Sequence, residues 1–195
     1  MSVSRATLVL ACIAVAALVA VGLTQLPGTG GATTPPLTPA RQAALLAGSP
    51  PALAALHRQG GQLLGGGAPA LHRRLQGLRG YPVVIDKWAS WCVPCRAEFG
   101  AFQRVAAGYG RRVAFLGLDS GDSSRAGARA FLRAHPVSYP SYYDPSGALG
   151  LQITDSSFTP VTVFVPARGV PFIHQGQYPS ARKLEEDVLR YALVP

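Results

Sequence analysis

Two cysteines, Cys92 and Cys95, are the residues whose type and spacing most directly predict chemistry. They form a C-x-x-C motif where an apolar run gives way to a helical pattern. A cysteine at a helix start is favoured as a thiolate, because unpaired N–H groups and the positive end of the helix dipole stabilise the anion. Cys95 follows on the same helical face, close enough to form a disulfide with Cys92. The motif therefore predicts a redox site in which Cys92 attacks and Cys95 resolves the mixed disulfide.

Two other interpretations of the pair stay open at this point. Cysteines at this spacing can form half of a zinc site. The third cysteine, Cys12, lies far away in an apolar segment, and the chain has no second C-x-x-C and no H-x-x-H motif, so we predict no metal site. A purely structural disulfide is the other alternative, but so small a loop restrains the unfolded chain little. The motif favours redox chemistry over both.

The elements around the cysteines are predicted from the hydrophobic pattern. Residues 81–88 are rich in β-branched side chains, which is typical of a buried strand. Residues 93–107 carry apolar side chains three and four apart, which predicts a helix with Pro94 in its first turn. The same criteria predict further strands at 112–119, 138–143, 161–165 and 170–174, and helical segments at 126–134, 146–151 and 180–191. Strands that alternate with helices and end in a paired hairpin indicate an α/β fold.

The segment WASWCVPCRAE, residues 88–98, resembles the active site of thioredoxin-fold oxidoreductases, most of all the membrane-anchored TlpA/ResA branch. The Thr159-Pro160 pair before an apolar strand and the turn YDPSG at 143–147 fit the same branch. The resemblance covers residues 78–192 and implies a thioredoxin-like three-layer sandwich with a central mixed sheet, a thiol–disulfide oxidoreductase and no bound cofactor. Two residues depart from the pattern: Gly100 stands where proline is common, and Lys87 where an apolar residue is usual.

The resemblance also implies which residues contact a substrate. In the thioredoxin fold the bond before Pro160 is cis and faces the cysteines, so that Thr159 presents backbone groups to an extended substrate segment. Trp91 is expected to shape the rim around the sulfurs, beside Val93 and Pro94 between the two cysteines.

Two acidic residues near the cysteines are candidate proton-transfer groups. Asp86 falls in the predicted buried strand, where an unpaired carboxylate is costly, and the resemblance implies that it lies beneath Cys95 and helps to deprotonate it. The alternative is an aspartate neutralised by Lys87 or by backbone donors. Glu98 follows Cys95 by one helical turn and matches the acid of the C-x-x-C-x-x-E pattern in the ResA branch. Its alternative is a surface carboxylate that stabilises the helix N-terminus.

The start of the chain predicts a membrane anchor, residues 1–26. Residues 6–26 carry no charge and would form a helix of about 31 Å, enough to span the hydrocarbon core. A cleaved signal peptide is the alternative, although its apolar core is usually about 7–15 residues and no small-x-small cleavage site follows here. Arg5 on the short side of the span places that end in the cytoplasm. We therefore expect a single-pass cell-membrane protein with an extracytoplasmic catalytic domain.

Three more segments complete the predicted organisation. Residues 27–40 are rich in proline, glycine and threonine without an apolar period, which indicates a flexible tether. Residues 41–78 carry leucines between glycine and proline breaks, which predicts an N-terminal extension of short helices packed on the core. Residues 79–195 form the predicted thioredoxin-like domain.

The charge balance bears on possible partners. The 195-residue chain has 18 Lys and Arg against nine Asp and Glu, a net charge of +9. Such a balance can indicate nucleic acid or an anionic membrane surface. The basic residues are mostly arginines scattered along the chain, so we predict no nucleic-acid binding, while weak attraction to anionic lipid stays open.

Together these features predict a membrane-tethered oxidoreductase that reduces protein disulfides and receives electrons from a membrane donor protein. Val93 and Pro94 donate no side-chain hydrogen bond and carry no charge, so little stabilises the Cys92 thiolate beyond the helix terminus and Arg96. This favours a reducing site over the first alternative, an oxidase that inserts disulfides. The second alternative is a copper-handling or folding-helper module, which a histidine within reach of both sulfurs would favour. The family resemblance suggests cytochrome c biogenesis as a process.

Overall fold

The structure, a computed structural model, describes residues 36–193. The predicted anchor and most of the predicted tether therefore lie outside the described residues. Residues from Pro36 onward belong to one compact unit. Within the described part of the chain, no helix is both long enough and apolar enough to cross a membrane.

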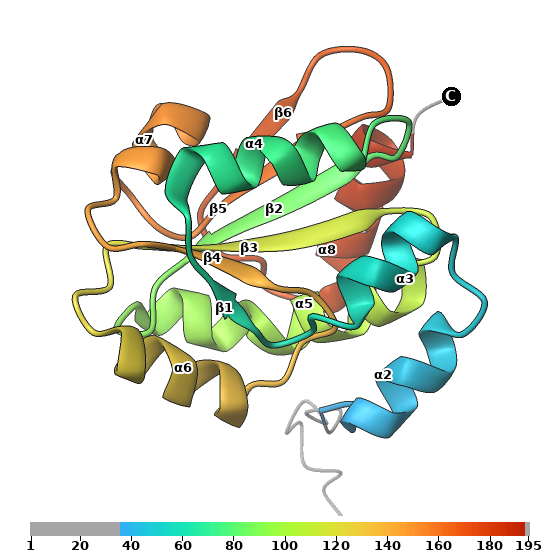
Figure 1. Ribbon diagram of the computed structural model, residues 1–195, viewed down its shortest axis with the longest axis horizontal. Coiled ribbons are helices and arrows are strands. Elements are labelled where there is room, and N and C mark those ends of the chain that lie inside the picture. Colours follow the sequence, from blue (N-terminus) through green and yellow to red (C-terminus); the bar gives the residue numbers. More distant parts are fainter. Residues whose placement is uncertain (1–35, 194–195) are drawn as a thin grey trace, which may run out of the picture. The chain divides into compact units, whose positions relative to one another are not determined.

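Helices and strands alternate along this unit (Figure 1). The helices are α2 (Pro39–Leu46), α3 (Pro51–His57), α4 (Gly67–Gly77), α5 (Val93–Tyr109), α6 (Arg125–Ala134), α7 (Ala148–Thr154) and α8 (Ala181–Asp187), which continues into the π-helical turn η1 (Val188–Ala192). The strands are β1 (Leu63–Leu64), β2 (Val83–Trp88), β3 (Ala114–Ser120), β4 (Ser141–Asp144), β5 (Val161–Val165) and β6 (Phe172–Gln175).

The strands form one mixed sheet in the order β1-β4-β3-β2-β5-β6. The four strands from β1 to β2 run parallel to their neighbours, whereas β5 is antiparallel to both β2 and β6. β2 is therefore a central strand, and all six of its residues are buried. The mixed sheet and the buried strand at 83–88 confirm the predicted α/β fold.

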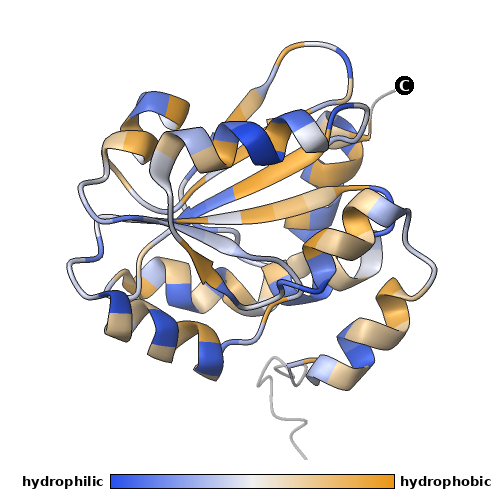
Figure 2. Cartoon of the chain, viewed as in Figure 1, coloured by the Kyte–Doolittle hydropathy of each residue, from blue (hydrophilic) through white to orange (hydrophobic). Residues whose placement is uncertain are grey.

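Helices cover the sheet on both faces, and each face has its own apolar core (Figure 1). Because side chains alternate along a strand, Val84, Asp86 and Trp88 of β2 lie toward the core shared with α5, α6 and α8. Val83 and Ile85 lie toward the core shared with α3, α4 and α7. The arrangement confirms the thioredoxin-like sandwich, and Figure 2 shows β2 and β3 as largely hydrophobic, with a hydrophilic stretch at the end of β2 nearest the start of α5.

Trp88 fixes α5 against the sheet just before the cysteine motif. Its ring lies 5.3 Å from that of Phe99 on α5 and 5.1 Å from that of Phe131 on α6, measured between centroids. Its indole N–H donates to Ser141 Oγ at 3.2 Å. A side chain at Gly117 would place its Cβ 2.9 Å from the indole nitrogen and 2.1 Å from Ser141 Oγ, so this site needs glycine. Trp88 is therefore a core residue with no exposed surface.

The N-terminal extension, residues 41–78, contributes a strand that the sequence pattern does not predict. β1 is a two-residue strand at the edge of the sheet and pairs in parallel with β4. Leu53 and Leu56 of α3 have no exposed surface and pack in the core on the α4 side of the sheet. Two residues carry too little periodicity to be recognised as a strand. The segment between α2 and α4 is therefore part of the folded unit.

Candidate functional site

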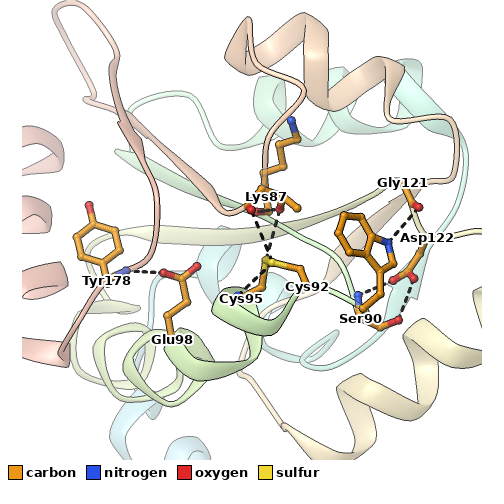
Figure 3. The surroundings of a disulfide bond; sticks show 10 residues. Lys87, Ser90, Cys92, Cys95, Glu98, Gly121, Asp122 and Tyr178 are labelled. Carbon is orange, nitrogen blue, oxygen red and sulfur yellow. Dashed lines mark hydrogen bonds between the residues drawn. A yellow bond between two sulfur atoms is a disulfide. The ribbon is translucent and has the colours of Figure 1, made fainter.

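The two cysteines meet at the N-terminus of α5 and form a disulfide with an S–S distance of 2.04 Å (Figure 3). Cys92 is the residue just before the helix, and its sulfur accepts a hydrogen bond from the Cys95 backbone N–H at 3.2 Å. Cys95 has no exposed surface, whereas Cys92 keeps 3% of its surface exposed. Of the two cysteines, Cys92 is thus the more exposed.

The loop that ends at Pro160 lies directly against the two sulfurs. The Thr159–Pro160 peptide bond is cis, as the resemblance implies. The Thr159 carbonyl oxygen is 3.7 Å from Cys92 Sγ, and Thr159 Oγ1 is 3.5 Å from Cys95 Sγ. Thr159 Oγ1 also donates to the Lys87 carbonyl oxygen at 2.9 Å, which ties the loop to the end of β2.

Apolar side chains surround the disulfide at the surface. Trp91 is 61% exposed and Val93 75% exposed, and Pro94 beside it is also exposed. The Trp91 indole N–H donates to the Gly121 carbonyl at 3.2 Å, which holds the ring beside the loop after β3. Phe158, one residue before Thr159, is 76% exposed. Sequence reasoning missed Phe158, although its position two residues before Pro160 could have singled it out.

Asp86 and Glu98 are both almost completely buried. Asp86 accepts a hydrogen bond from the Tyr139 hydroxyl at 3.4 Å, and Glu98 accepts one from the Tyr178 backbone N–H at 2.7 Å. Each carboxyl has a second oxygen without a partner. Burial raises the pKa of Asp86 to about 8. Burial and the charge of Asp86 raise the pKa of Glu98 to about 9, so both carboxyls hold protons near neutral pH.

The structure bears on the alternatives for these two acids. Lys87 does not neutralise Asp86, because its side chain points away from the disulfide and its ammonium donates to the Ser156 carbonyl and to Thr154 Oγ1 (Figure 3). Glu98 is 1% exposed and is therefore a buried carboxyl, not a surface one. The arrangement provides two neighbouring proton-holding groups, and Glu98 lies on α5 one turn after Cys95.

Comparison with known proteins finds similarity to thiol–disulfide oxidoreductases. No protein-family model matches the chain. The chain is 30% identical to the thiol:disulfide interchange protein DsbE of Pseudomonas fluorescens biotype C over 93 residues, which is 48% of this chain and 50% of that protein. It is 26% identical to the thiol-disulfide oxidoreductase ResA of Oceanobacillus iheyensis over 96 residues, 49% of this chain and 50% of ResA. The chain spans about half the length of the curated relatives it matches.

A solved structure agrees on the fold. A secreted Mycobacterium tuberculosis disulfide oxidoreductase homologous to Escherichia coli DsbE superposes with a TM-score of 0.53 at 23% identity, covering 59% of this chain and 85% of that one. The chain is a thioredoxin-fold relative of the thiol–disulfide oxidoreductases. This confirms the resemblance that the cysteine motif predicts.

In this thioredoxin-like protein, a second set of polar residues holds the loop before Cys92. The Asp122 carboxylate accepts hydrogen bonds from the Ser90 backbone N–H at 2.7 Å and from Ser90 Oγ at 2.8 Å (Figure 3). Asp119, at the end of β3, is fully buried, and burial together with Asp122 and Asp144 raises its pKa to about 9. The sequence shows only a polar loop here. The signal that could have found these residues is topological, since parallel neighbours β2 and β3 end at the same edge of the sheet.

In residues 36–193, no group of three or more His, Cys, Asp or Glu side chains could hold a metal ion. His135 lies against Phe131 in a tilted arrangement with ring centroids 4.4 Å apart, and His174 stacks on Tyr178 at 4.1 Å. These two histidines therefore contact aromatic rings.

The raised pKa of Asp86 predicts a pH-dependent stability. In the unfolded chain this carboxyl ionises near its ordinary pKa of 3.8, but in the folded chain only near 8. Between these values the unfolded chain gains a charge that the folded chain does not, so stability falls as pH rises through this window. Asp86→Asn removes the effect. We expect it to raise the free energy of unfolding by a few kcal/mol at pH 7 and hardly at pH 4, measured by urea unfolding.

Asp155→Asn is the matched control, because it makes the same change of side chain at an exposed position. It should change the free energy of unfolding little at either pH. An equal gain from Asp86→Asn at pH 4 and pH 7, or a loss at pH 7, would contradict the assignment of a buried, protonated Asp86.

Proposed function

We propose that this protein is a membrane-tethered, extracytoplasmic thiol–disulfide oxidoreductase that reduces disulfides in partner proteins through the Cys92–Cys95 dithiol. The observation that carries the proposal is the disulfide at the start of α5, flanked by the Thr159–Pro160 loop. The relatives named DsbE and ResA support the reaction class. Cytochrome c biogenesis is the process that the resemblance suggests.

The reaction balances without a bound cofactor. In the reduced protein, the Cys92 thiolate attacks one sulfur of the substrate disulfide, forms a mixed disulfide and expels the other sulfur as a thiolate. The Cys95 thiolate then attacks Cys92 Sγ, which forms the Cys92–Cys95 disulfide and releases the second substrate thiolate. Two electrons pass to the substrate, and its two thiolates take up two protons. A dithiol in a membrane donor protein would return two electrons to this site.

The deprotonated form of the buried acids Asp86 and Glu98, whose fraction grows as pH rises toward 8 to 9, is the proton acceptor for the second step. Cys95 is fully buried, so its thiol has no direct route to bulk water for its proton. Glu98 lies on the same helix one turn away, and Asp86 interacts electrostatically with Glu98. A carboxyl whose pKa is raised to about 8 or 9 has a pKa closer to that of a thiol than an ordinary carboxyl has, which favours proton transfer between the two groups. We assign Asp86 and Glu98 to deprotonation of Cys95.

Substrate contact falls to the exposed groups around the disulfide. Thr159 offers backbone groups beside Cys92, which suits an extended segment bound in the manner of an added strand. Trp91, Val93 and Pro94 supply apolar surface for that segment. The disulfide-forming oxidase remains the main rival function, because the same geometry serves exchange in either direction.

The order of attack is tested by trapping a partner. We expect Cys95→Ser to accumulate a mixed disulfide through Cys92, because the resolving thiol is missing. Cys92→Ser should trap little, because Cys95 has no exposed surface. The measurement is non-reducing electrophoresis of thiol-blocked cell extracts followed by mass spectrometry of the trapped cysteine. The double variant Cys92→Ser/Cys95→Ser is the control, and trapping by Cys92→Ser alone would reverse the roles of the two cysteines.

Membrane tethering is tested by fractionation of cells that express the full chain. We expect the intact chain in the membrane fraction, resistant to extraction with salt and alkali, because residues 6–26 are predicted to span the bilayer. A protease added outside the cytoplasm should digest the redox domain. Recovery of a soluble, shortened chain that lacks residues 1–26 would contradict the anchor and favour a cleaved signal peptide.

A further inference from the structure

Acidic and basic side chains are distributed very differently between the interior and the surface. Six of the nine acidic side chains are buried, namely Asp86, Glu98, Asp119, Asp122, Asp144 and Asp187. Lys87 is the one buried basic side chain among residues 36–193. The described surface is therefore more basic than the net charge of +9 conveys.

The remaining acids do little to offset this charge near the disulfide. Glu185 and Glu186 lie on α8, where Glu185 accepts a hydrogen bond from Tyr109 and Glu186 pairs with Arg182 and Lys183. Outside α8, Asp155 is the one exposed acid in residues 36–193. Among the buried acids, Asp86 and Glu98 have raised pKa values of about 8 and about 9 and so add little negative charge near neutral pH, while Asp122 accepts two hydrogen bonds from Ser90.

Arg96 places a positive charge in the first turn of the helix that carries the reactive cysteines. It follows Cys95 directly in the first turn of α5, and its side chain is exposed. Its guanidinium carbon lies 5.9 Å from the centre of the Phe131 ring on α6. Within the described chain Arg96 forms no ion pair, and the exposed Arg129 continues the basic surface along α6. Figure 2 shows hydrophilic stretches along the outer side of α6.

An unpaired arginine beside a functional centre has a defined chemical preference. Arginine binds carboxylates in a bidentate manner, and complementary charge raises the rate of encounter between partners by an amount that falls with ionic strength. Trp91 and Val93 flank Cys92 in the sequence, Phe158 precedes Thr159, and all three apolar side chains are exposed. A segment that fits this rim would combine apolar residues with an acidic residue near its cysteine.

Resting on the proposed function, we propose that the preferred substrate is a cysteine-containing protein segment with acidic residues close to the cysteine, bound by Arg96 at the apolar rim of Trp91, Val93 and Phe158. The binding precedes exchange and leaves its chemistry unchanged: Cys92 still attacks the substrate disulfide and Cys95 still resolves. Arg96 acts by selecting the substrate.

The test compares three disulfide-linked peptides that differ only in the residues flanking cysteine, which are glutamate, glutamine or lysine. The full-length protein is reduced and desalted, and the second-order rate of exchange is measured for each peptide. Each rate is divided by the rate with dithiothreitol, which corrects for the intrinsic reactivity of the peptide disulfide. At low salt we expect the glutamate peptide to react at least about tenfold faster than the lysine peptide, and the difference to shrink at high salt.

Substitution locates the effect. Arg96→Gln should lower the ratio of the glutamate-peptide rate to the glutamine-peptide rate about three- to tenfold. A change in the Cys92 thiolate would alter both rates by the same factor and cancels in this ratio, so the ratio reports substrate selection alone. Arg168→Gln is the matched control, because Arg168 is exposed in the turn between β5 and β6, at the opposite end of β5 from Pro160. It should change the glutamate-peptide rate less than twofold.

The outcomes distinguish this proposal from the proposed function. Absence of exchange with all three peptides would overturn the proposed function itself. Exchange at equal corrected rates would retain the function but overturn the acidic substrate, leaving an anionic lipid surface as the partner of the arginines. An equal loss in Arg96→Gln and Arg168→Gln would also overturn it, since the effect would then come from total charge alone.

Discussion

Burial of β2 on both faces is the constraint on which the site depends. This central strand carries Asp86 and Lys87, two ionisable neighbours whose side chains leave on opposite faces of the sheet. An unpaired charge in such a place costs several kcal/mol, so each residue must find partners or lose its charge. The two residues meet this demand in different ways, and both outcomes shape the surroundings of the disulfide.

Lys87 finds oxygen acceptors in the segment that leads to the cis-proline. Its ammonium donates to the Ser156 carbonyl and to Thr154 Oγ1, and its carbonyl accepts from Thr159 Oγ1. One residue thus holds the chain between α7 and β5 at both ends, with Thr159 beside the sulfurs. The family that this chain resembles has an apolar residue where this chain has Lys87. The buried lysine replaces apolar packing with hydrogen bonds to the segment between α7 and β5.

Asp86 meets the same demand by keeping its proton. It has a single donor, the Tyr139 hydroxyl, and burial together with the neighbouring Glu98 favours the uncharged carboxyl. Two carboxyls that titrate well above the ordinary range of Asp and Glu, close to a buried cysteine, can accept a proton at the pH at which a thiol gives one up. Under the proposed function, the cost of burying these acids in folding is linked to their use in exchange.

Local patterns in the sequence predict the strand and the helix on either side of Cys92. They do not predict contacts between segments that are far apart in the sequence. β2 and α5 follow from an apolar run and a helical period, and Cys92 at the helix start follows from the motif. The Ser90–Asp122 contact joins residues 32 apart, and the exposure of Phe158 depends on how its loop lies on the sheet. Residue spacing along the chain does not encode such contacts, which arise only once β2, β3 and β5 are adjacent.

The redox poise of the Cys92–Cys95 pair tests the central claim most directly. Strong oxidants owe their potential to unusual stabilisation of the nucleophilic thiolate, and Val93 and Pro94 offer neither a charge nor a side-chain donor. Equilibration of the protein in glutathione buffers of graded ratio, followed by alkylation and mass spectrometry, gives the midpoint potential. A reducing site predicts about −200 to −270 mV, between the glutaredoxin and thioredoxin values, whereas a midpoint above about −150 mV would contradict the account and indicate an oxidase.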